Sequence, residues 1–159
     1  MEFVWKPSGG NNRTQIFTHV LNNHYGEPDG FDFDPYSGQQ PGWQDREFKL
    51  TDAHLLDIDL QKRRKAYKTN DLFVLFGNDF RYRNASENFR HLDRMITFMN
   101  THSGYNFKYS TPEQYIDAIA RKNIVWPTKY DDLFPYADHE DSYWSGYFTS
   151  RPNLKSLIK

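Results

Sequence analysis

The pattern of hydrophobic and polar residues divides this chain into three parts. Residues 1–50 hold Gly, Pro, Asn and Asp in close succession, as in GEPDGFDFDPYSGQQPGW, which is typical of loops. Residues 51–127 are regular, with apolar residues three or four apart in some segments and in short unbroken runs in others. Residues 128–159 are irregular and rich in aromatic side chains until LKSLIK, which opens as a helix would.

The regular part predicts strands and helices in alternation. Strands are expected at residues 72–76, 107–109 and 124–126. Helices are expected at 51–67 with Thr51 as N-cap, at about 86–100, and after Thr111, where Gln114 completes a capping box, to near Asn123. Strand and helix in this order favour right-handed crossovers and a parallel sheet. The predicted fold class is therefore α/β, with residues 1–159 in one domain.

Composition and charge narrow the classes of protein. Aromatic residues make up 18% of the chain, against 37% for all hydrophobic residues, so we expect Phe, Tyr and Trp to build much of the core. The net charge is -1, and the single basic run, Lys62–Lys65, reads as a solvated helix end, so no nucleic-acid partner is expected. No apolar run approaches the roughly 18 residues that span a bilayer. Without cysteine, the chain has no disulfide framework.

The main candidate for chemistry is Asp79. The apolar run 72–76 leads directly into Gly77-Asn78-Asp79, and functional groups of α/β folds collect where parallel strands end. Asp79 is either a turn residue, as Asp often is, or a general acid/base. In the second case, the neighbouring Phe80 would desolvate the carboxyl group and favour its protonated form. The residues alone leave both interpretations open.

Other candidates are weaker. His19 and His24 lie five apart, which is not the H-E-x-x-H spacing, and the histidines do not form a metal-binding motif. Trp144 either stacks against a sugar ring or anchors a loop. The tripeptides beginning at Asn12 and Asn84 are N-glycosylation sequons, and they permit a lumenal or secreted setting.

Three segments carry a resemblance to a known family: GNDFRYRNA, STPEQYIDAI and DDLFPYADHEDSYWSGYFTSRP. They resemble glycoside hydrolase family 38, and within it the lysosomal-type α-mannosidases, with the strongest likeness over residues 71–155. The resemblance implies an internal fragment of the N-terminal catalytic domain of a longer protein, so both ends of the chain are expected to be cuts. It also implies a partial (β/α) barrel, part of a seven-stranded one, completed by the remainder of that domain.

The family implies a retaining exo-α-mannosidase that removes terminal α-D-mannose from glycoprotein N-glycans. In that scheme Asp79 matches the general acid/base and Trp144 a pocket wall that faces the mannose. Asn78 stands at a position that is Asp in Golgi-type relatives and is a candidate substrate contact. Placement in the lysosome, another secretory-pathway lumen or outside the cell is implied as well.

What the chain lacks follows from the same resemblance. The zinc ligands and the nucleophilic Asp of the family belong to segments outside residues 1–159, so zinc is a cofactor expected in the full-length parent only. A retaining glycosidase needs two carboxyl groups about 5–5.5 Å apart. The isolated chain, with one of them, is therefore expected to be inactive. The alternative is a non-catalytic truncated relative, or a remnant that binds mannosides.

Overall fold

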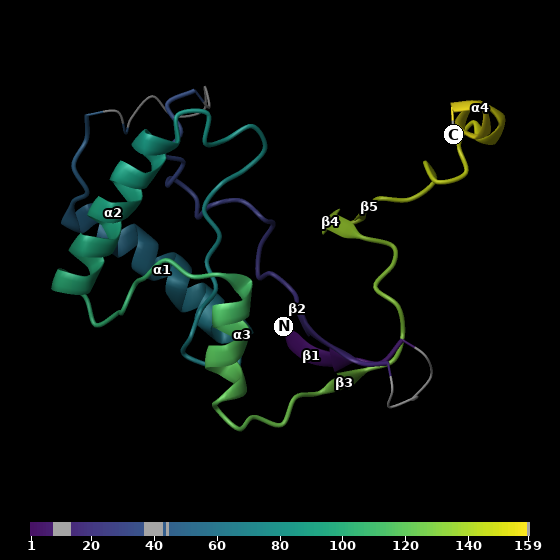
Figure 1. Ribbon diagram of the computed structural model, residues 1–159, viewed down its shortest axis with the longest axis horizontal. Helices are drawn as coiled ribbons and strands as arrows, with labels where there is room; N and C mark the ends of the chain where they lie inside the picture. The colour runs from purple at the N-terminus through teal and green to yellow at the C-terminus, as the bar shows by residue number, and fades with distance from the viewer. Residues whose placement is uncertain (8–13, 37–42, 44, 159) are drawn as a thin grey trace. The chain divides into compact units, whose positions relative to one another are not determined.

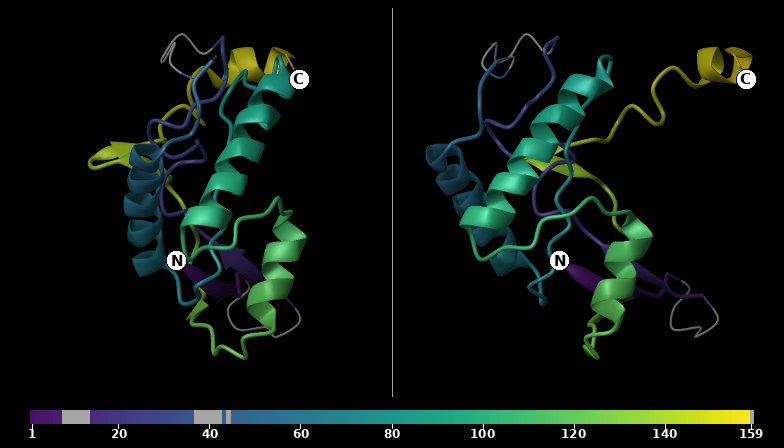
Figure 2. Two further views of the ribbon diagram at one scale, coloured as in Figure 1. Left: turned by 90° about the vertical axis from the view of Figure 1, so that its left-hand side faces the viewer. Right: turned by 60° about the vertical axis from the view of Figure 1, so that its left-hand side comes forward.

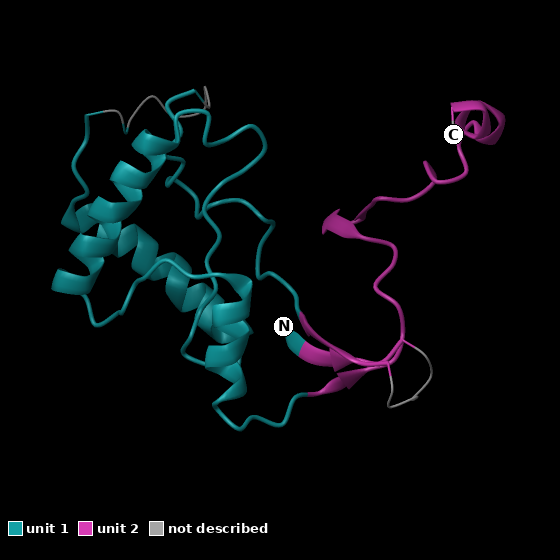
Figure 3. Cartoon of the chain, viewed as in Figure 1, with its two compact units in different colours: residues 1–2, 19–126 teal, residues 3–18, 127–159 magenta. Residues whose placement is uncertain are grey.

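The computed structural model describes residues 1–7, 14–36, 43 and 45–158 (Figure 1). Its helices are α1 Leu50–Ala66, α2 Ala85–His102, α3 Pro112–Ala120 and α4 Pro152–Ile158. Its strands are β1 Glu2–Trp5, β2 Ile16–His19, β3 Thr128–Lys129, β4 Ala137–His139 and β5 Ser142–Tyr143. The chain forms two compact units, the first of residues 1–2 and 19–126 and the second of residues 3–18 and 127–159 (Figure 3).

The core of the first unit lies where α1 and α2 run side by side (Figures 1 and 2). Each helix contributes residues three or four positions apart, which fall on one face. Large aromatic side chains from the preceding loop fill the space beside them. The core residues are Phe31, Phe33, Trp43, Phe48, Leu56, Leu60, Leu92, Met95 and Met99. The prediction that aromatic residues carry much of the core is confirmed.

Side chains next to the first turns of α3 and α1 determine where these helices begin. Thr111 caps α3 as predicted, because its hydroxyl accepts the Gln114 N–H at 3.2 Å while the Gln114 side chain accepts the Thr111 N–H. The predicted N-cap of α1, Thr51, is wrong. The buried carboxylate of Asp52 accepts the Lys49 N–H at 2.8 Å, so Lys49 becomes the N-cap and the helix begins at Leu50.

The predicted strand at residues 72–76 is wrong as well, because these residues form no strand. Alternate side chains still contact different neighbours, as in an extended segment. Leu72, Val74 and Phe76 pack against the core between α1 and α2, whereas the Phe73 ring stacks on Tyr115 of α3 with centroids 5.3 Å apart. Side chains bind the end of the segment in place of a neighbouring strand, since the Tyr82 hydroxyl donates to the Phe76 carbonyl at 2.8 Å.

The predicted strands at residues 107–109 and 124–126 are absent for the same kind of reason. The side-chain amide of Asn100 satisfies both the N–H and the carbonyl of Phe107, at 2.6 and 2.9 Å. Lys68 donates to the carbonyl of Val125 at 3.0 Å. In each segment, side chains take backbone groups that a parallel sheet would use.

The second unit contains the strand pairing. Its sheet has the order β2-β1-β3, and β1 runs parallel to β3 with Val4 opposite Thr128 and Trp5 opposite Lys129. The indole of Trp5 donates to the Asp131 carbonyl at 2.9 Å, just past β3. Strands β4 and β5 form a separate antiparallel pair. The expected helix at the end of the chain is α4. The assignment to part of a β/α barrel stays a prediction.

Candidate active site

The Asp79 carboxylate lies at the surface of the first unit, on a tight turn after the 72–76 segment. The Arg81 N–H donates to the Asn78 carbonyl at 3.2 Å and so closes the turn. The carboxylate is exposed, and the ion pairs found among the described residues do not include it. Its Oδ2 accepts a hydrogen bond from the Tyr25 hydroxyl at 3.1 Å. An exposed carboxylate with one phenol donor is accessible to a ligand.

The backbone around Asp79 adopts conformations that most residues avoid. Gly77 has φ +136°, and a Cβ there would lie 2.9 Å from Cε2 of the Tyr82 ring. Phe80 and Tyr82 have φ 60° and 62°, in the left-handed region that costs about 1–2 kcal/mol for a residue with a side chain. Residues 77–83, called the acid loop below after the carboxyl group of Asp79, therefore depend on contacts from elsewhere to keep their shape.

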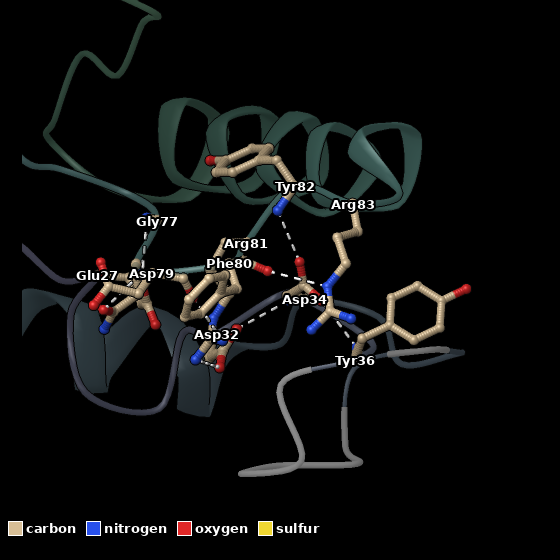
Figure 4. Close-up of polar contacts among 11 residues, drawn as sticks. Glu27, Asp32, Asp34, Tyr36, Gly77, Asp79, Phe80, Arg81, Tyr82 and Arg83 are labelled. Carbon is tan, nitrogen blue, oxygen red and sulfur yellow. Dashed lines mark hydrogen bonds and ion pairs between the residues drawn. The ribbon is translucent and has the colours of Figure 1, made fainter.

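Those contacts come from residues 27–34. Asp34 is buried, and its Oδ2 accepts the Tyr82 N–H at 2.8 Å (Figure 4). Asp32 pairs with the Arg81 guanidinium at 3.0 Å. Glu27 accepts the Gly77 N–H at 3.2 Å, and burial followed by the charge of Glu27 raises the pKa of Tyr82, which keeps that phenol protonated. Carboxylates thus hold both ends of the acid loop.

The expected desolvation of Asp79 by Phe80 is not found. The Phe80 ring is 82% exposed, because the left-handed backbone directs it to solvent.

A cavity of about 10 Å³ lies between Gly77, Tyr82, Asn88 and neighbouring residues, with room for about one water molecule. It is too small for a sugar ring.

Asn78 has a role in the turn itself. Its Oδ1 accepts the Asp79 N–H at 2.8 Å, and its amide nitrogen is 3.1 Å from the place where a Cβ on Gly26 would lie. Asn78 is exposed, and contact with a substrate stays a prediction.

Of the two sequons, Asn84 is the N-cap of α2 and accepts the Ser86 hydroxyl at 2.7 Å, whereas Asn12 lies outside the described residues.

Trp144 belongs to the second unit, directly after β5. The backbone N–H of Trp144 donates to the Tyr136 carbonyl at 2.8 Å, and the centroids of the two rings are 6.1 Å apart. Hydrogen bonds from the side chains of Ser142 and then Trp144 lower the pKa of Asp138, and the Ser142 hydroxyl donates to Asp138 Oδ1 at 2.8 Å. The ring is nevertheless 51% exposed. About half of the Trp144 side chain is therefore accessible to a ring that could stack on it.

Comparison with known proteins decides the family. A model of the glycosyl hydrolases family 38 N-terminal domain matches residues 1–139. The chain belongs to glycosyl hydrolase family 38. The lysosomal α-mannosidase of Dictyostelium discoideum is 40% identical over the whole chain, and that of Cavia porcellus is 37% identical over 98% of it. An α-mannosidase of Canavalia ensiformis is 36% identical over 95% of it. The alignments cover 16% of each relative, so this family 38 chain spans about a sixth of their length.

Three further findings concern the family 38 chain. No group of three or more His, Asp or Glu residues that could hold a metal ion is found in the described ranges. His19 is a packed histidine, stacked on Tyr67 at 4.7 Å and bonded to Glu2 at 3.1 Å. Within the same described ranges, no helix has the length and apolar character to cross a membrane.

Sequence reasoning missed Tyr25, which it assigned no role. The hydrogen bond to Asp79 joins residues 54 positions apart, and no spacing rule relates them. A signal did exist for the contacts from residues 32 and 34, because in Phe-Asp-Phe-Asp at 31–34 carboxylates alternate with aromatic residues that build the core. Such carboxylates lie at the border of a core, where backbone N–H groups need acceptors.

Proposed function

We propose that this chain is part of the catalytic domain of a retaining exo-α-mannosidase, and that Asp79 is its general acid/base. The observation that carries the proposal is the exposed Asp79 carboxylate on the acid loop, bonded to Tyr25, in a family 38 chain whose relatives are named α-mannosidases. The proposed substrate is terminal α-D-mannose on glycoprotein N-glycans. The names of two of the relatives favour a lysosomal location for the full-length protein.

In the proposed mechanism, Asp79 moves a proton twice. Its protonated carboxyl group gives a proton to the departing glycosidic oxygen while a nucleophilic carboxylate attacks the anomeric carbon. The resulting Asp79 carboxylate then takes a proton from the water that releases mannose. Tyr25 orients the carboxylate through its hydrogen bond to Oδ2, which leaves the other oxygen to face the substrate.

The other parts of the proposed site are only partly in this chain. Trp144 would stack its exposed indole face against the sugar ring, as aromatic rings do with the apolar face of a sugar, and Asn78 would contact the substrate beside Asp79. The nucleophile and the zinc ligands would come from segments outside residues 1–159, which would also complete the β/α barrel. Zinc, when bound there, would orient the mannose hydroxyls.

The direct test replaces Asp79 by Asn in the full-length protein and compares aryl α-mannosides with good and poor leaving groups. Loss of a general acid should lower kcat/KM by about 10²–10⁴ for the poor leaving group and far less for 2,4-dinitrophenyl α-mannoside, whose leaving group needs no proton. Asp29→Asn, which neutralises another exposed carboxylate of the first unit, is the matched control. Equal losses with both substrates would refute the acid/base assignment.

A further inference from the structure

We propose that Asp34 is a positioning residue for Asp79, whose buried carboxylate holds the acid loop in the backbone conformation that presents the proton donor. The inference rests on the proposed function, because Asp34 acts only through Asp79. Asp34 is 2% exposed and lies 45 positions before Asp79 in the sequence. It is not itself a proton donor to substrate.

Both oxygens of Asp34 are engaged by backbone donors. Oδ2 accepts the Tyr82 N–H at 2.8 Å and Oδ1 accepts the Tyr36 N–H at 2.9 Å. The Asp34 N–H in turn donates to Oδ1 of Asp32 at 3.0 Å, which ties the Asp34 backbone to the Asp32 side chain. A carboxylate has an acceptor at each end, whereas an amide has an acceptor at one end and a donor at the other. Asn at this position would leave one of the two N–H groups facing an NH₂ group.

The bond to Tyr82 acts where the loop is strained. Tyr82 has φ 62° and Phe80, two residues earlier, has φ 60°, so neither residue would hold this conformation by its own preference. A short charge-assisted hydrogen bond to a buried carboxylate favours the strained conformation over relaxed ones. Asp32 adds to this effect through its ion pair with Arg81, the residue between them (Figure 4).

The loop conformation determines where Asp79 points. The turn from Asn78 to Arg81 includes Asp79, and it ends next to Tyr82. Because Phe80 lies in this turn and Tyr82 follows it, we expect that rotation of either residue out of the left-handed region would move the Asp79 carboxylate relative to the Tyr25 hydroxyl. A displacement of about 1 Å of a catalytic group can cost a hundredfold in rate. Asp34 therefore affects proton donation without touching the substrate.

The experiment measures kcat/KM of the full-length Asp34→Asn protein with a poor leaving group and with 2,4-dinitrophenyl α-mannoside. We expect a tenfold to hundredfold loss, roughly, for the poor leaving group and less than about threefold for the activated one. The double variant Asp34→Asn/Asp79→Asn should be no slower than Asp79→Asn alone, because the two residues serve one step. Multiplicative losses in the double variant would overturn the inference.

A matched control separates positioning from general stability. Asp52 is likewise a buried carboxylate of the first unit that accepts a backbone N–H. Unlike Asp34 it also pairs with an arginine, Arg46, and its contacts serve the start of α1. Asp52→Asn should lower the activity with both substrates by the same factor, in proportion to the folded fraction. If Asp34→Asn behaves in this way, Asp34 is structural only and the inference fails. If Asp79→Asn itself has no leaving-group dependence, the proposed function fails instead.

Two further variants keep the test decisive if Asp34→Asn does not fold. Asp32→Asn removes the ion pair with Arg81, while the amide oxygen of Asn can still accept the Asp34 N–H. This variant should give the same leaving-group dependence with a smaller loss. Phe80→Asn places at an 82% exposed position a residue that tolerates positive φ, so it should restore part of the loss in either variant. A leaving-group-independent loss in Asp32→Asn, together with no recovery by Phe80→Asn, would contradict the proposal.

Discussion

The Tyr25 hydroxyl donates a hydrogen bond to Oδ2 of Asp79 at 3.1 Å, across 54 positions of sequence. The two residues lie on separate loops of the first unit, and both are exposed, Tyr25 by 42%. A donor from another segment fixes one oxygen of the carboxylate without burying it. This arrangement orients the Asp79 carboxylate while leaving it open to a ligand.

Under the proposed function, Tyr25→Phe should lower kcat/KM of the full-length protein. The change removes one hydrogen bond to a charged group, worth about 1.5–3 kcal/mol, and keeps the ring that packs 4.0 Å from His24. We expect a loss of about tenfold to a hundredfold with a poor leaving group. Tyr36→Phe removes an exposed phenol outside the hydrogen bond and should leave the rate unchanged. A Tyr25→Phe enzyme with wild-type kinetics would show that this contact has no part in catalysis.

Gly77→Ala should destabilise the acid loop. A Cβ at this position would lie 2.9 Å from the Tyr82 ring, and φ +136° strains any residue with a side chain, by about 1–3 kcal/mol. We expect a lower midpoint of thermal unfolding and slower turnover of poor leaving groups. Gly104→Ala is the matched control, since a Cβ there meets nothing within 4 Å and its φ is not positive. Equal effects of the two variants would contradict the strain argument.

The isolated chain should not hydrolyse mannosides. Residues 1–159, expressed alone and assayed with 4-nitrophenyl α-mannoside and added zinc, contain the proposed acid/base without a nucleophile. The expected rate equals that of the buffer. The same preparation of Asp79→Asn serves as the control for contaminating enzyme. Turnover that depends on Asp79 would mean that the residues outside this chain are not needed.

His91 should make the protein less stable as the pH falls. Burial, then the charges of Arg90 and Arg94, lower the pKa of His91, and Arg90 donates to its Nε2 at 3.2 Å. The unfolded chain takes up a proton near pH 6.5, while the folded state stays neutral to lower pH. Below about pH 6.5 the unfolded state therefore binds more protons, and the free energy of unfolding decreases.

His91→Gln tests whether His91 causes this decrease in the free energy of unfolding at low pH. The Gln side-chain oxygen can accept the same hydrogen bond from Arg90, and Gln does not titrate. The difference in unfolding midpoint between pH 7.5 and pH 5.5 should be smaller in His91→Gln than in the wild type. His54→Gln, at an exposed position, should leave the difference unchanged. A larger difference in His91→Gln would mean that the folded state favours the protonated imidazole.

Local signals predicted the helices well and the strands poorly. The capping box at Thr111 was predictable, because its hydrogen bonds lie within four residues. The run at 72–76 carries the composition of a strand, but a strand also needs a partner backbone, and in this structure side chains such as Tyr82 take its place. The position of Asp79 after an apolar run makes it a candidate for chemistry, and its role stays a prediction. Tyr25 contacts Asp79 over 54 positions, and no local pattern reports this pair. The alternation of Asp with core Phe residues at 31–34 marks Asp34 as a carboxylate at the border of the core, but it does not identify Tyr82, 48 positions away, as the partner.

The acid loop and residues 25–34 depend on each other through hydrogen bonds and an ion pair, although more than 40 residues of sequence separate them. Recombination between related enzymes would have to transfer both segments from the same parent. A chimera with a junction inside α1 would combine the carboxylates of one parent with the strained turn of the other. Such junctions should be depleted among active recombinants, whereas junctions within α2, beyond the turn, should be tolerated.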